Sequence, residues 1–313
     1  MRYYVTIEAC EANLRERISP GDQILVLKPW QPVYTQLAFL PDGADVIACP
    51  PTTWSKQEKE EFAYKVSESV LSLMVTKNTV AHFHDTWVKN LIFNYDQLYR
   101  ARLADEIQGQ GPATIYGNGP SLNPDIQEGV IFSPWHCTKR ITKAHYIGHI
   151  DAALPMDATG RHAPTRFKPE RGIIAVPTVA PEFLETHKND TFYVYFSQGC
   201  SIDMHLASKL NTPGHGPISC TVVDMLMQVA IMAGHKEIHL TGIDLCFNSP
   251  EEGKAYDPIK ELYEDKAVDG RTVWTHIGWH KQKLAAEGLI RRNPHIKFIN
   301  HSNGLLIEGT ENV

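Results

Sequence analysis

The sequence predicts an α/β protein with a Rossmann-like, mainly parallel sheet that carries helices on both faces and follows a small α/β N-terminal unit. Short apolar runs bounded by Gly and Pro alternate with longer segments of helical periodicity. Strands that alternate with helices need crossover connections, which makes their sheet mainly parallel. Hydrophobic residues make up 42% and charged residues 21% of the 313 residues, a globular balance that suits two units.

The first predicted unit covers residues 1–108. Apolar runs at 23–28 and 44–49 are typical of strands. A capping-box pattern at Ser55–Glu58 precedes helical spacing of apolar residues between Phe62 and Met74. These features predict a small α/β unit.

A second long helix is predicted to begin at Asp85 and to connect the two units. Its N-cap is Asp85, and the run 108–112, rich in Gly and Pro, ends it. Four apolar residues define its expected buried face: Val88, Leu91, Ile92 and Leu98. The preceding His82-Phe83-His84-Asp85 is the nearest approach to a metal-ligand pattern, but a strand end followed by a helix cap is the favoured interpretation.

The second predicted unit covers residues 109–313. Its expected strands are 113–116, 130–132, 146–150, 173–176, 192–196, 238–240 and 296–299, and its expected helices are about 180–188, 219–233 and 277–293. Ligands of parallel sheets bind at the carboxyl ends of the strands. The loops that follow these strands are therefore the candidate site.

The first candidate loop is Gly117-Asn118-Gly119-Pro120-Ser121, directly after a strand. Its two glycines permit close backbone approach, and the amides of such a turn can cradle a phosphate. A tight turn needed only for packing is the alternative, since the loop matches neither the Walker pattern nor a full GxGxxG.

Two carboxylates also follow strands. Asp151 can hold a sugar hydroxyl or a divalent cation, or it can cap the next segment. Asp244 follows Gly242, which lets the chain turn close to a ligand, and an Asx turn is the alternative there.

Hydroxyl groups and histidines complete the candidate site. Ser219, Cys220 and Thr221 precede an apolar helix, where a hydroxyl can cap the helix or leave amides free for an anion. His276 and His280 share one helical face if the helix begins before them, and an imidazole in a cleft can act as general base. Their neighbours Trp274 and Trp279 can stack on a base or sugar ring, although a surface helix is the alternative.

Charge and hydropathy exclude several classes of protein. Lys and Arg number 30 against 36 Asp and Glu, a net charge of −6 without the basic stripe of a nucleic-acid binder. No apolar run approaches the ~18 residues of a membrane span. The N-terminus lacks the apolar core of a secretory signal. We therefore expect a cytoplasmic protein without nucleic-acid partners.

Six motifs in order resemble the DUF115 superfamily, which includes the Maf (motility accessory factor) flagellin-modifying proteins and the MptE-like 6-hydroxymethylpterin diphosphokinases. The motifs are GNGPSL (117–122), YIGHIDA (146–152), the small-residue turn at 219–221, GHKEIHLTGIDL (234–245), VDGRTVWT (268–275) and INHSNGLLIEG (299–309). GNGPSL and AIMAGHKEIHLTGID (230–244) are also similar to the family 42 sialyltransferases. The resemblance covers roughly residues 84–310, because residues 84–94 resemble a helix that precedes this domain in Maf proteins.

This resemblance implies a nucleotide-binding fold and assigns roles to residues. In the sialyltransferases the glycine turn and its Asn contact the cytidine nucleotide of CMP-sialic acid, which points to residues 117–121 here, and the small-residue turn carries over to 219–221. A late His is the base of those enzymes, and the matching IG of 277–278 lies beside His276 and near His280. In the pterin kinases carboxylates serve a Mg²⁺-dependent transfer, a role open here to Asp151 and Asp244.

Three hypotheses follow from the resemblance. The first is a glycosyltransferase whose donor is a CMP-activated nonulosonic acid (sialic, pseudaminic or legionaminic type) and whose acceptor is a protein or glycan. The second is a pyrophosphokinase of the pterin type, which would use ATP and Mg²⁺; the first hypothesis needs no cofactor. The third is a non-catalytic nucleotide-binding protein. A homo-oligomer is compatible with each.

Overall fold

A computed structural model describes much of the chain, and its parts fall into two compact units, Met1–Asp85 and Thr86–Val313. The described residues are 3–6, 23–26, 45–48, 55–56, 82–153, 167–197, 201–209, 212, 214–216, 221–256 and 261–313. In the first unit, β1 (Tyr3–Thr6), β2 (Gln23–Val26) and β3 (Asp45–Ala48) form a parallel sheet in that order. The strands predicted at 23–28 and 44–49 are thus confirmed, whereas the helix expected from Phe62 to Met74 lies outside the described residues.

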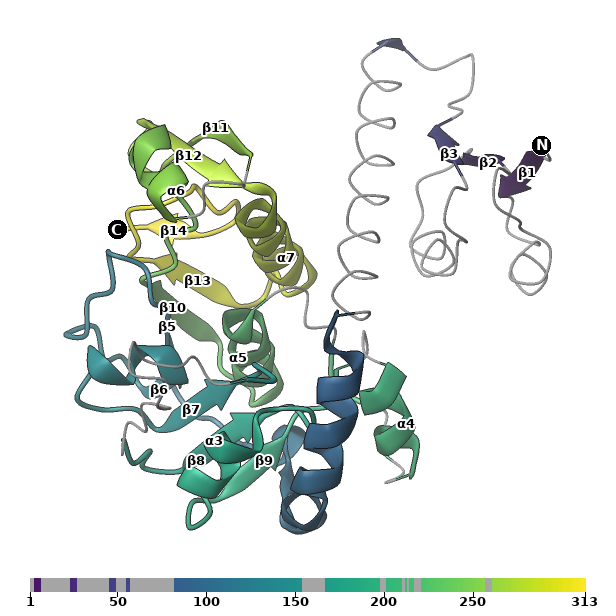
Figure 1. The fold of residues 1–313 in the computed structure, drawn as a ribbon. Coiled ribbons are helices and arrows are strands. Elements are labelled where there is room, and N and C mark those ends of the chain that lie inside the picture. The colour runs from purple at the N-terminus through teal and green to yellow at the C-terminus, as the bar shows by residue number, and fades with distance from the viewer. Residues whose placement is uncertain are drawn as a thin grey trace. The chain divides into compact units, whose positions relative to one another are not determined.

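The second unit is built on a nine-stranded sheet in the order β14-β13-β10-β5-β6-β7-β8-β9-β4 (Figure 1). Its strands are β4 (Arg102–Leu103), β5 (Ala113–Tyr116), β6 (Val130–Pro134), β7 (Tyr146–His149), β8 (Gly172–Ala175), β9 (Phe192–Val194), β10 (Glu237–Thr241), β13 (Lys297–Asn300) and β14 (Glu311–Asn312). Each neighbouring pair is parallel. The predicted α/β class and all seven strands expected in this unit are confirmed.

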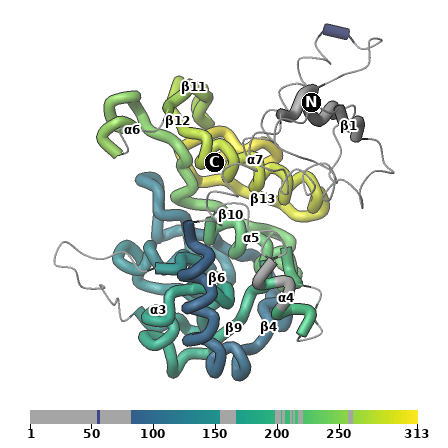
Figure 2. The backbone as a smooth tube through the Cα atoms, turned by 45° about the vertical axis from the view of Figure 1, so that its right-hand side comes forward, coloured from purple at the N-terminus to yellow at the C-terminus, as the bar shows by residue number. Residues whose placement is uncertain are grey.

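Helices and one hairpin complete the second unit. They are η1 (Ala104–Glu106), η2 (Trp135–Lys139), α3 (Pro181–Thr186), α4 (Ser201–Lys209), α5 (Val222–Met232), α6 (Pro250–Tyr256), α7 (Ile277–Arg292) and the antiparallel pair β11 (Leu262–Lys266) and β12 (Thr272–His276). Figures 1 and 2 show α6 beside this hairpin, against which it packs. Within the described residues, no helix combines the length and apolarity needed to cross a membrane.

The core of the second unit lies between α5 and the central strands. β5, β6 and β7 are buried along their whole length, and α5 packs against all three. Met225, Leu226 and Val229 of α5 are fully buried. A Cβ on Gly148 of β7 would lie 2.8 Å from the Leu226 side chain, so this glycine allows the helix to approach the sheet closely.

The helix that precedes this sheet differs from its prediction. Residues 82–100 are helical, so Asp85 lies inside the helix and does not cap it. The helix ends at residue 100, well before the expected run of Gly and Pro. Val88 and Ile92 are exposed, and the buried positions are Asn90 and Asn94 instead. The expected apolar face is therefore wrong at those two residues.

The two asparagines attach this helix to the ends of β7 and β8. Asn90 Nδ2 donates to the carbonyls of Ala152 and Thr178 at 2.7 and 2.9 Å. Asn94 Nδ2 donates to the carbonyls of residues 177 and 179 at 3.0 and 2.8 Å. Because β4 also joins the large sheet, residues 86–108 belong with the second unit, and the boundary expected at residue 108 lies too late in the chain.

Candidate functional site

A cavity of about 470 Å³ opens in the second unit at the carboxyl ends of β5 and β10. The chain runs outward from β5 through β6 to β9 and then returns to the other side of β5 as β10. Such a reversal of strand order leaves a crevice between the two strands, where doubly wound sheets bind ligands. The cavity wall includes residues 117–120, 221–224 and 242–247, with His136 and parts of α6 and α7.

Two glycines join the loops after β5 and β10. Gly117 N donates to the Thr241 carbonyl at 2.7 Å, and Gly119 N donates to the Gly242 carbonyl at 2.8 Å. A Cβ on Gly117 would lie 2.3 Å from the Gly242 oxygen, and Gly242 itself has a φ of +73°. A side chain at Gly117 or at Gly242 would force the two loops apart.

Asp244 ties the same two loops together from the β10 side. Its Oδ2 accepts a hydrogen bond from Ser121 N at 3.0 Å, and a Cβ on Gly119 would lie 2.1 Å from that oxygen. The amides of Gly117, Gly119 and Ser121 therefore all donate within the protein. The expected open amide cradle for a phosphate is wrong for these three groups, because protein oxygens already occupy them.

The carbonyls of the glycine turn are held by an arginine. Arg140 Nη1 donates to the carbonyls of Asn118 and Gly119 at 2.9 and 2.8 Å, and its Nη2 donates to that of Pro120 at 3.4 Å. The side chain of Asn118 is exposed at the cavity wall. Arg140 thus fixes the turn from one side and leaves the Asn118 amide available to a ligand on the other.

Thr221 caps the helix that follows it, which was one of the two roles expected for a hydroxyl at this position. Thr221 Oγ1 caps α5 by accepting from Asp224 N at 3.4 Å, and both residues line the cavity. Ser219 and Cys220 lie outside the described residues.

His276 and His280 do not line the cavity. His276 is the last residue of β12 and caps α7, because its Nδ1 accepts from Gly278 N at 3.1 Å. The helix therefore begins after His276, so the condition under which both histidines would share a helical face is not met. His280 Nδ1 lies 3.9 Å from an Asp265 carboxylate oxygen of the hairpin.

Three aromatic rings form one side of the cavity, here called the aromatic wall: Phe247, Tyr256 and Trp279. The ring centroids of Phe247 and Trp279 are 4.5 Å apart, and that of Tyr256 lies 5.5 Å from Phe247. Trp279 was expected at the site, but Trp274 does not line the cavity. Phe247 and Tyr256 come from segments without a ligand motif, so sequence reasoning missed them.

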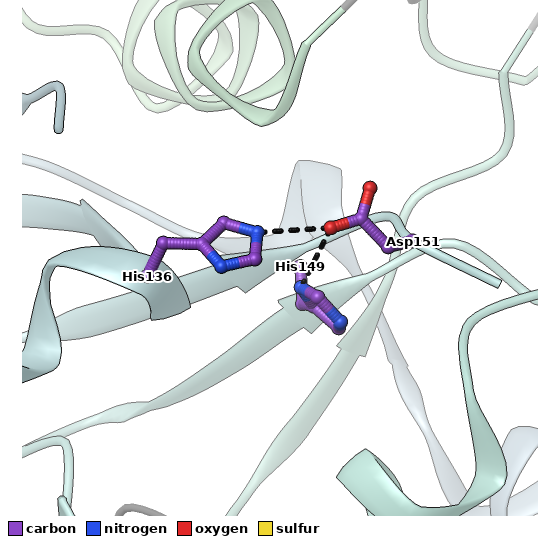
Figure 3. A group of neighbouring side chains, drawn as sticks. All are labelled: His136, His149 and Asp151. Atoms are coloured by element: carbon purple, nitrogen blue, oxygen red, sulfur yellow. Dashed lines mark hydrogen bonds and ion pairs between the residues drawn. The ribbon is translucent and has the colours of Figure 1, made fainter. Parts of the chain in front are cut away.

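A His-His-Asp cluster lies beside the cavity, at the carboxyl ends of β6 and β7 (Figure 3). Asp151 Oδ2 is 2.9 Å from His136 Nε2 and 3.8 Å from His149 Nδ1. His136 also lines the cavity, whereas Asp151 does not. The sequence singled out Asp151 but missed both histidines; an HxD at one strand end and a His after the preceding strand were the available signal.

Burial and charge act differently on the members of this cluster. Burial lowers the pKa of His149 to about 4, against a smaller opposite effect of the Asp151 carboxylate. Burial raises the pKa of Asp151, but the hydrogen bond with His136 and the charge of both imidazoles outweigh it, so that the pKa is lowered overall. The carboxylate is therefore ionised and His149 is neutral at pH 7.

The charged side chains on the cavity wall are acidic. Asp224, Asp244 and Glu252 line it, and the described residues contribute no Lys or Arg to the lining. A phosphorylated ligand would therefore depend on hydrogen bonds, or on a bound cation, for its negative charge.

The fold is shared with a known enzyme structure. The Maf glycosyltransferase from Magnetospirillum magneticum AMB-1 superposes with a TM-score of 0.55 at 14% identity, over 94% of this chain and 53% of that one. This chain thus spans about half the length of that protein. The likeness establishes the fold.

A weaker likeness is to the sialyltransferase CstII from Campylobacter jejuni in complex with the substrate analogue CMP-3FNeuAc. Its TM-score is 0.32 at 15% identity, over 65% of this chain and 89% of that one, which is too low to carry an argument. No protein-family model and no curated protein matches the chain. Membership of the superfamily suggested by the motifs therefore stays a prediction.

Proposed function

We propose that the chain is a glycosyltransferase whose donor is a CMP-activated nonulosonic acid. The observation that carries the proposal is the cavity between the ends of β5 and β10, whose wall combines the GNGP turn with three aromatic rings. Its volume of about 470 Å³ lies in the range of small-molecule sites.

The wall offers groups suited to a nucleotide sugar. Aromatic rings provide apolar faces on which a base or a sugar ring can stack. The Asn118 amide can donate and accept hydrogen bonds, as recognition of a pyrimidine edge requires. The donor class rests on the similarity of GNGPSL and residues 230–244 to the family 42 sialyltransferases, and the transferase class is supported by the fold shared with a Maf glycosyltransferase.

In the proposed reaction an acceptor hydroxyl attacks the anomeric carbon of the donor. The bond from that carbon to the phosphate oxygen breaks, and CMP leaves with the electron pair. The hydroxyl proton passes to a base at the cavity, and neither His276 nor His280 lies on its wall. Asp244 binds Ser121 N, so we assign it to shaping the turn rather than to proton transfer.

The lining charges favour this donor over ATP. A pyrophosphokinase stabilises the transferring phosphates with cationic side chains as well as Mg²⁺. Three carboxylates and, among the described residues, no Lys or Arg line the cavity. A monophosphate leaving group carries less charge into such a site than a triphosphate does.

Calorimetric titration of the full chain with CMP, and with ATP in the presence and absence of Mg²⁺, tests the proposal. We expect CMP to bind and ATP to bind more weakly. Asn118→Ala should weaken CMP binding without changing the melting temperature, because this side chain is exposed; Asp125→Ala, on the loop after the same turn, is the control. ATP binding that depends on Mg²⁺ would support the kinase instead, and the absence of nucleotide binding would support a non-catalytic protein.

A further inference from the structure

We propose that His136, His149 and Asp151 form a binding site for one divalent transition-metal ion of the zinc class at the edge of the cavity. The metal-binding proposal stands on the geometry of these residues. The role of the metal ion in sugar transfer rests on the proposed function.

The three side chains converge from neighbouring strand ends. His136 follows β6, and His149 and Asp151 end and follow β7, which pairs with β6. One donor atom from each residue lies within 4.8 Å of the other two. Figure 3 shows both imidazoles directed at the same carboxylate oxygen. Donors of a tetrahedral zinc site are about 3.3 Å apart for bonds of about 2.0–2.1 Å, so small side-chain movements close this site.

His149 is the member of the cluster that a purely structural role explains least well. Its side chain is 1% exposed, and neither ring nitrogen forms a hydrogen bond with the residues that the structure describes. Buried polar groups are normally hydrogen-bonded. Trp135 and Phe183 hold the ring in place, with centroids 5.3 and 4.7 Å away. A metal ion would use the lone pair of a nitrogen that is otherwise left without a hydrogen bond.

The donor set selects the class of metal. Two imidazoles and one carboxylate suit zinc and related first-row ions, whereas Mg²⁺ prefers a shell of oxygens. Three protein ligands also leave a fourth position open to water or substrate. This site therefore differs from the oxygen-only Mg²⁺ site that a pyrophosphokinase would need from Asp151 and Asp244.

A cation here would supply the positive charge that the cavity wall lacks. His136 contributes both to the cluster and to the wall, so the ion would lie at the cavity edge. The described lining offers carboxylates and no Lys or Arg. An ion bound to the cluster would offset these carboxylates and stabilise the phosphate of a departing nucleotide.

Titration of the metal-free full chain with Co²⁺, a spectroscopic substitute for Zn²⁺, tests the site. We expect one Co²⁺ per chain with visible absorption bands of a four- or five-coordinate ion, competition by Zn²⁺, and much weaker competition by Mg²⁺. His136→Ala and Asp151→Asn should each weaken binding by about tenfold or more. The control is His295→Ala, which removes an exposed imidazole outside the cluster.

Circular dichroism of each variant checks that it is folded, and we expect both to fold because the side chains of His136 and Asp151 are 33% and 48% exposed. Binding that is absent in the wild type, or equal in wild type and His136→Ala, would overturn the site and leave His136 and Asp151 as a simple hydrogen-bonded pair. Co²⁺ binding without CMP binding would keep the site and reject the transferase. CMP binding without Co²⁺ binding would keep the transferase and overturn the metal site.

Discussion

The strand ends on either side of β5 are built in opposite ways. Between β5 and β10, the amides of Gly117, Gly119 and Ser121 all donate to oxygens of the protein. Two strands from β5, at the end of β7, the buried His149 has no hydrogen bond to any described residue. Satisfied backbone groups make the first region a rigid frame. The second keeps a donor atom unused, as sites selected for chemistry rather than for stability often do.

The largest expected effect tests the rigidity of the first region. Gly242→Ala should lower the free energy of unfolding by about 3 kcal/mol or more, since its Cβ would lie 2.5 Å from the Gly117 oxygen at a positive φ. Gly270→Ala is the matched control, because its φ is +83° and nothing lies within 4 Å of its Cβ; we expect about 1 kcal/mol there. Urea titrations measure both. Equal losses in the free energy of unfolding for the two variants would show that the close contact between the loops contributes nothing to stability.

A second test compares the two carboxylates. Asp244→Ala should cost about 2 kcal/mol, because it leaves Ser121 N without its acceptor in a partly buried place. Asp151→Ala should change stability little, since this side chain is half exposed and its partners among the described residues are the imidazoles of His136 and His149. The same urea titrations check the order. If Asp151→Ala lowered stability more than Asp244→Ala, the cluster at the end of β7, and not the loops after β5 and β10, would be the rigid region.

The opposite ends of β6 and β7 allow a test with pH. His145 Nδ1 accepts from Ile131 N at 2.9 Å, and burial lowers the pKa of His145 despite the nearby Glu170 carboxylate. The fold therefore favours the neutral imidazole, so its contribution is present above the ordinary value of 6.5 and is lost as pH falls below it. Melting temperature should fall between pH 7.5 and 5.

His145→Asn should lessen this fall, because an Asn oxygen can accept the same amide hydrogen bond without titrating. An unchanged pH profile in this variant would assign the acid sensitivity to other buried histidines.

The smallest expected effect on stability concerns His149, at the end of β7. His149→Phe should leave the melting temperature unchanged or slightly higher, because an apolar ring replaces a buried imidazole that makes no hydrogen bond to the described residues. The same variant should lose Co²⁺ binding. A marked loss of stability would show that the imidazole holds the structure together.

Much of the fold of the second unit could be predicted, because its strands are short apolar runs with Gly and Pro at their ends. The loops that hold the glycine turn, Thr221, Gly242 and Asp244 were singled out from their position after strands or before a helix, and residues of each loop line the cavity. This succeeded because parallel sheets gather such loops at one edge.

The missed features depend on contacts that sequence periodicity does not contain. His136 follows a strand without any motif, and only the pairing of β6 with β7 brings it to Asp151. The hairpin strand β11 is largely polar, and its half-exposed and exposed residues show no clear alternation. His276 was expected in a cleft, but its side chain caps α7.

The two asparagines of the helix at residues 82–100 have a consequence for how that helix is positioned. Asn90 and Asn94 are one turn apart and reach carbonyls after two different strands. Each residue rotates the helix by about 100°. Deleting a single residue between them would rotate one amide away from its loop. The two asparagines therefore fix both the rotation of this helix about its axis and its position along that axis.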